Sequence, residues 1–181
     1  MLSKLSRLFH SWARGWIILA LFAVFVVFVA VTMPLLRAAP GGSVVSLDAQ
    51  FFYTPEQAFS TVASYGDAGR FWIRIYLTWD IANPILYTLA FSLLISWLVQ
   101  RVYMPGSKLQ RLNVLPVGAG LFDVLENICI VTLLAVYPAR PALVAWLGTV
   151  CTMSKMIFLG MSTLLILAGL VKAITDRFKK Q

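Results

Sequence analysis

The chain has 181 residues and a net charge of +8, and 60% of its residues are hydrophobic while only 12% are charged. Soluble domains average about 45–50% apolar and about 25% charged residues, so this composition excludes a soluble globular protein and predicts an integral membrane protein. The single histidine, His10, lies in the basic N-terminal segment, which excludes a histidine-ligated zinc or haem site within the membrane. We therefore expect no metal and no cofactor.

Residues 1–14 have the pattern of an amphipathic helix on the cytoplasmic membrane surface. Leu5, Leu8 and Trp12 recur at helical spacing, whereas Lys4 and Arg7 occupy other angles of the helix. We interpret this segment as an anchor that orients the protein.

Four apolar stretches are long enough to cross about 30 Å of hydrocarbon at about 1.5 Å per residue. These predicted spans are residues 15–36, 71–99, 114–137 and 142–171. The first has no ionisable residue, so we expect it to seal the bundle against lipid or a partner. Four spans leave room for one bundle, and we predict an all-α, polytopic membrane protein with a four-helix transmembrane bundle and no separate soluble domain.

The connection 37–70 between the first two spans carries the signals of one short helix. Thr54 is a strong N-cap, Pro55 suits the first helical position and Gln57 completes a capping box. Gly66 would end the helix. We expect a helix over about 55–65 at the outer membrane interface, with Asp67 as the N-cap of the next span.

The distribution of basic residues predicts the topology. Most Lys and Arg residues fall in residues 1–14, in the loop 100–113 and in the tail 172–181, which share one side of a four-span chain. The other side has Arg37, Arg70, Arg74 and Arg140. The positive-inside rule then places both termini in the cytoplasm. The basic excess indicates contact with anionic membrane lipids and not with nucleic acid.

The second predicted span carries a polar face. Tyr76, Asp80, Asn83 and Tyr87 stand at positions i, i+4, i+7 and i+11, which share one side of a helix. Pro84 has no N–H to donate, so we expect the carbonyl oxygen of Asp80 to be free beside these side chains.

The third span places Asp123, Glu126 and Asn127 on one face, and the fourth places Thr152 and Lys155 on another. Counted from the outer ends of the spans, the ionisable groups lie roughly 14–21 Å deep, near the midplane. A charge at that depth costs roughly 2.5–3.5 kcal/mol, so the polar faces should turn toward one another. We predict a single cluster shared by the last three spans.

This predicted cluster holds three carboxyl groups and one lysine, an excess of negative charge that is costly to bury. Either a carboxyl group keeps its proton or a cationic ligand completes the site. The candidate catalytic groups, suited to acid–base work or a proton relay, are Asp80, Asp123, Glu126 and Lys155. The candidate ligand-binding residues further include Tyr76, Asn83, Tyr87, Asn127 and Thr152. A purely structural network would use the same residues.

Two arginines, Arg70 and Arg74, lie one turn apart at the outer end of the second span. We interpret them as candidates for binding lipid head groups, with a substrate carboxylate as the alternative.

A series of short motifs lies between residues 53 and 138. These motifs are Tyr53-Thr54-Pro55-Glu56-Gln57-Ala58, Gly69-Arg70, Asp80 with Pro84 and Tyr87, and Phe122-Asp123 with Glu126-Asn127. In them the chain resembles a group of small, uncharacterised bacterial four-span integral membrane proteins. The resemblance implies the fold and a location in the bacterial inner membrane, and it implies no activity. The plan is also loosely similar to the four-span sterol-isomerase group, whose intramembrane histidine this chain lacks.

We hypothesise a multi-pass membrane protein whose intramembrane acidic cavity binds a lipophilic or cationic small ligand, with acid–base chemistry as a further option. One alternative is an accessory subunit of a larger membrane complex, in which the polar face packs against a partner. A second alternative is proton or ion conduction by a homo-oligomer. The expected partners are membrane lipids and, for the alternatives, other membrane proteins or further copies of the chain.

Overall fold

The computed structural model describes residues 2–37, 46–102 and 108–179, and 89% of this part of the chain is helical. No strand occurs among the described residues, which confirms the all-α fold. Four segments are long and apolar enough to cross a membrane: Gly15–Thr32, Gly66–Val102, Leu109–Val136 and Ala142–Phe178. The chain is thus a multi-pass helical membrane protein.

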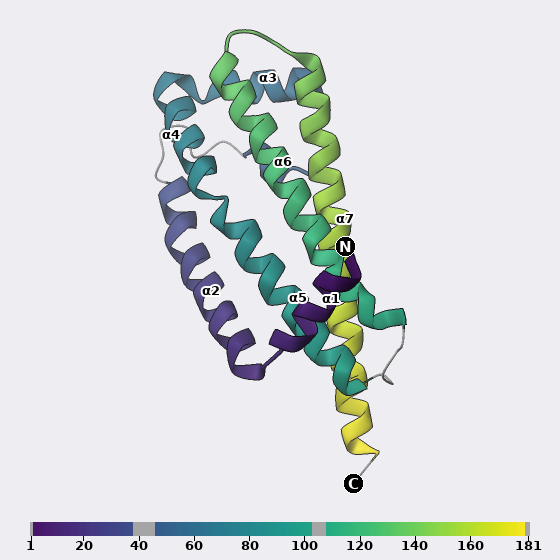
Figure 1. Cartoon of the computed structure of the whole chain (residues 1–181). Coiled ribbons are helices and arrows are strands. Elements are labelled where there is room, and N and C mark those ends of the chain that lie inside the picture. Colours follow the sequence, from purple (N-terminus) through teal and green to yellow (C-terminus); the bar gives the residue numbers. More distant parts are fainter. Residues whose placement is uncertain (1, 38–45, 103–107, 180–181) are drawn as a thin grey trace.

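The helices run back and forth between two ends of a bundle (Figure 1). In chain order they are α1 (Leu2–Trp12), α2 (Gly15–Arg37), α3 (Pro55–Ser64), α4 (Gly66–Trp79), α5 (Ala82–Val102), α6 (Leu115–Val136) and α7 (Ala142–Phe178). Two short 3-10 helices are η1 (Leu47–Ala49) and η2 (Lys108–Val114). The start of α2, the end of α5, η2 and the end of α7 gather at the lower end in Figure 1, whereas α3 crosses the upper end.

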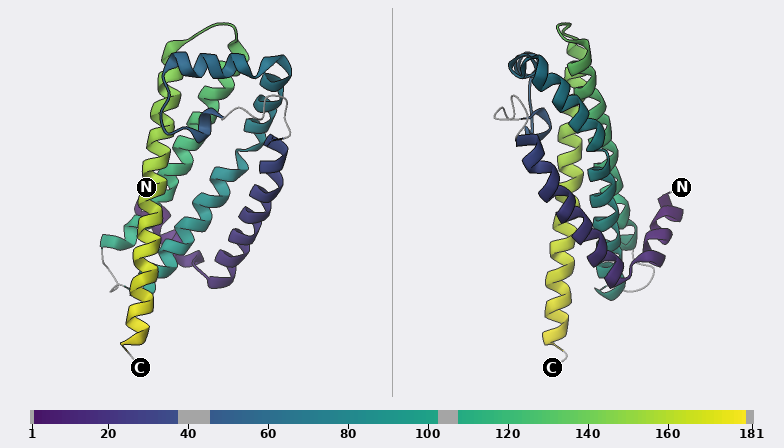
Figure 2. Two further views of the ribbon diagram at one scale, coloured as in Figure 1. Left: turned by 180° about the vertical axis from the view of Figure 1, so that it is seen from behind. Right: turned by 90° about the vertical axis from the view of Figure 1, so that its left-hand side faces the viewer.

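The core of the bundle is formed by α5, α6 and α7, which pack against one another. α6 and α7 are joined by a short connection and pack as an antiparallel pair. Gly120 of α6 allows α5 to approach closely, because a Cβ at this position would collide with the Thr88 hydroxyl. The first span, α2, packs mainly on α5 and stands apart from α6 and α7 (Figure 2).

The second predicted span consists of two helices in the structure. α4 already begins at Gly66, whose φ of 64° is a conformation that suits glycine, and its N-cap is Tyr65. The prediction that Asp67 caps this span is therefore wrong, since Asp67 lies within the first turn. α4 ends at Trp79, and α5 begins at Ala82.

The break between α4 and α5 also changes the role expected for the Asp80 carbonyl group. Asn83 N–H donates to the carbonyl oxygen of Asp80 at 2.9 Å and closes a turn. The prediction of a free carbonyl oxygen is therefore wrong, because the residue before Pro84 supplies the hydrogen that proline lacks.

The short helix predicted over about 55–65 forms as the local signals indicate. Gln57 N–H donates to Thr54 Oγ1 at 3.3 Å, and Thr54 N–H donates to Gln57 Oε1 at 2.8 Å, which together make the capping box. α3 begins at Pro55 and ends at Ser64, one residue short of the predicted end.

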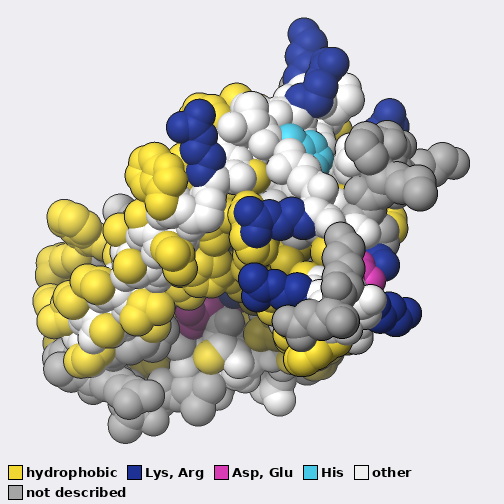
Figure 3. All heavy atoms as spheres, turned by 90° about the horizontal axis from the view of Figure 1, so that it is seen from below, with side chains coloured by type: hydrophobic (Ala, Val, Ile, Leu, Met, Phe, Trp, Pro, Cys, Tyr) yellow, Lys and Arg dark blue, Asp and Glu magenta, His cyan; other side chains and the backbone are white. Residues whose placement is uncertain are grey.

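At the lower end of the bundle, α1 packs on η2 and α5. The amide of Asn113 donates to the Ser6 carbonyl oxygen at 3.0 Å and to the Ser96 hydroxyl at 2.8 Å. Phe9 is buried in the same interface, while Trp12 is 53% exposed. Seen from this end, Lys and Arg side chains lie at the top, centre and right of the view (Figure 3).

Candidate functional site

The predicted polar cluster has formed inside the bundle, between α5, α6 and α7. Lys155 Nζ lies 2.5 Å from Glu126 Oε2 and 3.4 Å from Asp123 Oδ1. The Tyr87 hydroxyl donates to Asp123 Oδ2 at 3.0 Å, and the Thr152 hydroxyl donates to Glu126 Oε1 at 2.6 Å. Glu126 and Thr152 are fully buried. Five of the predicted residues therefore contact one another directly.

Asp80 lies at the break between α4 and α5 and borders this cluster. Its carboxyl group is buried and interacts electrostatically with Asp123 and Lys155. The Asn127 side chain faces Asp80, although neither of its amide atoms makes a hydrogen bond of normal geometry in the described part of the chain. Tyr76 lies beside Asp80 on α4. The cluster thus reaches from α7 across to α4.

Asn83 forms no side-chain hydrogen bond with the described residues of the cluster, although its helical spacing predicts that it shares the polar face. Its backbone N–H closes the turn at Asp80, while its buried side-chain oxygen has no hydrogen-bond partner among the described residues. No group of three or more His, Cys, Asp and Glu side chains in the described ranges is placed to hold a metal ion. The arrangement is one of ion pairs and hydrogen bonds between side chains.

A segment that sequence reasoning missed completes the site. Residues 46–54, which include η1, fold into the bundle below α3 (Figure 2). Lys155 Nζ donates to the Asp48 carbonyl oxygen at 3.4 Å, and the Thr149 hydroxyl donates to the Tyr53 carbonyl oxygen at 2.7 Å. Leu47 and Tyr53 are fully buried. We call residues 46–54 the inserted segment.

Tyr53 packs the inserted segment against α7. A Cβ at Gly148 would lie 2.5 Å from Tyr53 Oη, so glycine is required for this approach. Burial raises the pKa of Tyr53 to about 12, still further above physiological pH, so the phenol is neutral. Its hydroxyl lies beside Thr149 and Thr152 without a hydrogen bond of normal geometry. The inserted segment therefore closes the cluster on the side of α3 with a neutral aromatic side chain.

The inserted segment also adds a fourth carboxyl group. Asp48 interacts electrostatically with Asp80, Asp123, Glu126 and Lys155. One oxygen of its carboxyl group is buried and has no hydrogen-bond partner among the described residues. Lys155 is the one cation that forms ion pairs with these carboxyl groups in the described ranges. The acidic excess is larger than the sequence predicts.

A lateral groove leads to one member of the cluster. It has a volume of about 580 Å³ and is lined by six residues of α2 between Val24 and Leu35 and by five residues between Trp72 and Asp80. Only Thr32, Tyr76 and Asp80 among these residues are polar. The expectation that the first span seals the bundle is wrong here, because α2 packs on α5 and leaves this space beside α4.

The lining of the groove is largely exposed on the outside of the molecule. Val27 is 61% exposed, Val31 is 56% exposed and Trp79 is 77% exposed. In the view from the lower end, acidic surface is visible at the bottom of a hollow bordered by hydrophobic side chains (Figure 3). In a membrane these exposed apolar side chains face lipid, so the groove is open to the acyl-chain region.

Comparisons with protein-family models, with curated proteins and with solved structures give no match. The resemblance to bacterial four-span proteins stays a prediction.

Arg70 and Arg74 differ in their surroundings. Arg70 forms an ion pair with Asp67, donates to the Val62 carbonyl oxygen at 3.4 Å and lies 3.8 Å from the centre of the Tyr137 ring. Its side chain is only 12% exposed. These contacts of the Arg70 guanidinium group link α3, α4 and the end of α6. Contact of Arg70 and Arg74 with lipid head groups stays a prediction.

Proposed function

We propose that this protein binds an amphiphilic cation, whose apolar part lies in the groove between α2 and α4 and whose positive head group lies at Asp80. The observation that carries the proposal is that Asp80 belongs both to the groove and to the acidic cluster. The groove volume of about 580 Å³ lies within the range of about 300–1,000 Å³ that small-molecule sites occupy.

The charges explain why the head group should be a cation. Asp48, Asp80, Asp123 and Glu126 are balanced by Lys155 alone within the described part of the chain. Buried charges are costly unless they are paired, so a positive head group at Asp80 would offset part of the acidic excess. A neutral or anionic ligand would leave that excess in place.

The shape of the groove explains why the rest of the ligand should be apolar. Val24 to Leu35 spans roughly 16 Å along the axis of α2, at about 1.5 Å per residue. The lining is apolar except at Thr32, Tyr76 and Asp80, which suits a hydrocarbon chain with one polar end. Such a ligand can reach the site from the bilayer without crossing water.

The burial of the cluster supports a ligand site over an assembly surface. Asp123 and Glu126 lie inside the chain's own bundle, where a partner helix does not reach them. If the ligand undergoes acid–base chemistry, Asp80 is the group to perform it, because it is the carboxyl group that lines the groove. We further propose that the protein resides in the bacterial inner membrane with both termini in the cytoplasm, which its basic lower end supports.

The test compares two ligands with the same alkyl chain, one with a cationic head group and one with a neutral head group. Binding of dodecylamine and of dodecanol is measured by calorimetry on the protein in nanodiscs of zwitterionic lipid, with empty nanodiscs as the blank. We expect the amine to bind at least about tenfold more tightly than the alcohol, since a charge-assisted contact contributes about 1.5–3 kcal/mol. The Asp80→Asn variant should lose this difference.

Two further variants separate the head-group site from the groove. Val31→Trp should weaken both ligands alike by filling the groove. Asp176→Asn removes a carboxyl group that is paired with Lys172 at 3.3 Å, outside the groove, and should change neither affinity. An Asp80→Asn variant that binds the amine as tightly as the unchanged protein would overturn the proposal.

A further inference from the structure

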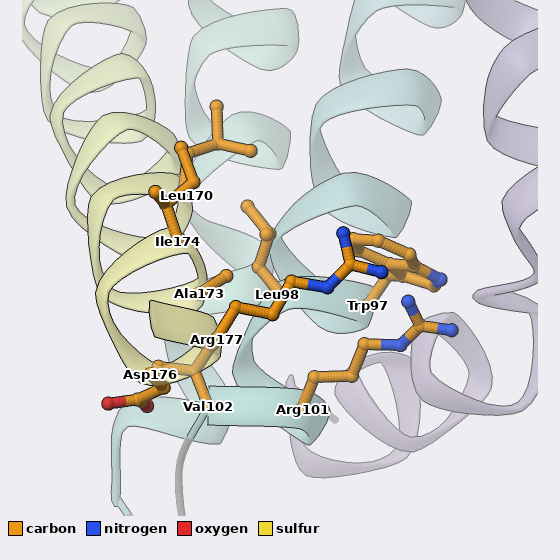
Figure 4. A pocket seen from close by; sticks show the side chains of 9 residues that line it. All are labelled: Trp97, Leu98, Arg101, Val102, Leu170, Ala173, Ile174, Asp176 and Arg177. Carbon is orange, nitrogen blue, oxygen red and sulfur yellow. The ribbon is translucent and has the colours of Figure 1, made fainter. Parts of the chain in front are cut away.

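A second pocket lies far from the groove, at the lower end of the bundle where α5 and α7 end (Figure 4). It has a volume of about 430 Å³. Arg101 and Trp97 line it from α5, and Arg177 lines it from α7. A site at this position would lie at the membrane–water interface, because Val102 ends the second apolar span.

Two guanidinium groups converge in this pocket. Figure 4 shows the Arg101 and Arg177 side chains extending from opposite walls toward Trp97. The Arg101 guanidinium carbon lies 3.7 Å from the centre of the Trp97 ring, which holds that side chain in place. Both arginine side chains are exposed. Two like charges so oriented favour an anion between them.

No carboxyl group among the described residues forms an ion pair with either arginine. The one acidic residue at the pocket, Asp176, pairs with Lys172 and points away from the guanidinium groups (Figure 4). The positive charge of the pocket is therefore not balanced by the described part of the chain. An anion that balances this charge must come from outside the described part of the chain.

The rest of the pocket wall is apolar. Leu98 is buried, whereas Leu170 is 39% exposed and Ile174 is 55% exposed on the face of α7. Leu170 and Ile174 continue from Arg177 toward the hydrocarbon region along α7. The pocket thus combines two charged donors at the interface with an apolar surface on the membrane side.

We infer that this pocket binds an anionic phospholipid, with Arg101 and Arg177 holding its phosphate group and with an acyl chain lying on Leu170 and Ile174. Planar guanidinium groups bind phosphate oxygens through paired hydrogen bonds, and basic pockets between membrane helices recognise anionic head groups. The ligand class differs from that of the groove, so the two sites can succeed or fail separately.

The experiment is a lipid titration of the full chain followed by native mass spectrometry. Phosphatidylglycerol and phosphatidylcholine are compared as ligands, and we expect phosphatidylglycerol to bind at least about tenfold more tightly. Arg101→Gln with Arg177→Gln should remove this preference. Arg101→Lys with Arg177→Lys should leave an intermediate affinity, because it keeps the charges and loses the paired hydrogen bonds.

Matched controls distinguish specific binding in this pocket from nonspecific electrostatic attraction. Arg111 is an exposed arginine of η2 at the same end of the molecule, and Arg111→Gln should not change the affinity. Ile174→Asn should weaken the lipid complex, and inorganic phosphate should not displace the lipid. An equal loss in Arg111→Gln, unchanged binding in the double glutamine variant, or displacement by inorganic phosphate would each overturn the inference.

Discussion

Lys155 supplies the positive charge that pairs with the buried carboxyl groups. It forms ion pairs with Asp123 and Glu126 and also donates to the Asp48 carbonyl oxygen, so it joins α6, α7 and the inserted segment. Removing one partner of a buried ion pair leaves the other charge uncompensated, at a cost of about 3–5 kcal/mol.

Lys155→Met should therefore lower the free energy of unfolding by about 3–5 kcal/mol, measured by denaturation in mixed micelles. The second change Glu126→Gln should restore part of this loss, because it removes one of the stranded charges. Lys179→Met, at the exposed end of α7, serves as the control and should have little effect. Equal stability of Lys155→Met and the unchanged protein would contradict a central role for this ion pair.

Residue types and spacing were sufficient to predict much of the cluster. Asp123, Glu126 and Asn127 share a face of α6 because helical periodicity is local, and the cost of burying charge directs that face inward. Asp48 and Tyr53 could not be predicted in the same way. The sequence around them offers one weak signal, the aromatic run Phe51-Phe52-Tyr53 beside an acidic residue in a segment too short to span.

Among the elements, the inserted segment shows where prediction from the sequence ends. The α3 cap depends on residues three positions apart, so it can be recognised from Thr54 and Gln57 alone. The inserted segment is held by a hydrogen bond from Thr149 to Tyr53, residues 96 positions apart. No local pattern encodes such a contact. The groove could not be predicted from a local pattern either, because it depends on how α2 packs against α5.

The docking of the inserted segment can be tested through Gly148. A Cβ there would lie 2.5 Å from Tyr53 Oη but 3.4 Å from the next atom, Cβ of Cys129. Gly148→Ala should therefore destabilise the protein by about 1–3 kcal/mol, as overpacking does. In a Tyr53→Phe background the same change should cost clearly less, because the obstructing oxygen is gone.

A double-mutant cycle on unfolding free energies measures this coupling. Thr163→Ala, on an exposed part of α7, is a suitable control in both backgrounds. Additive effects of Gly148→Ala and Tyr53→Phe would place Tyr53 away from α7 and contradict the docking of the segment.

Across the whole molecule, charge and apolar surface are divided between distinct regions. The acidic excess is buried within the bundle and reaches the groove at Asp80, whereas the pocket with two arginines lies at the lower end. The number of spans could be predicted from apolar length, and the four observed spans match it. The sequence does not predict that α2 packs on α5 and stands apart from α6 and α7. The reason is that α2 is apolar on every side and has no face that specifies its neighbour.

We propose that an amphiphilic cation lies in the groove with its head group at Asp80. The most direct measurement is photo-crosslinking with a long-chain alkylamine that carries a diazirine near the chain end, followed by peptide mapping. We predict that adducts concentrate on α2 between Val24 and Leu35 and on α4 between Trp72 and Trp79, and that Asp80→Asn removes them. Adducts spread evenly over lipid-facing residues of α6 and α7, or adducts unchanged by Asp80→Asn, would contradict the claim.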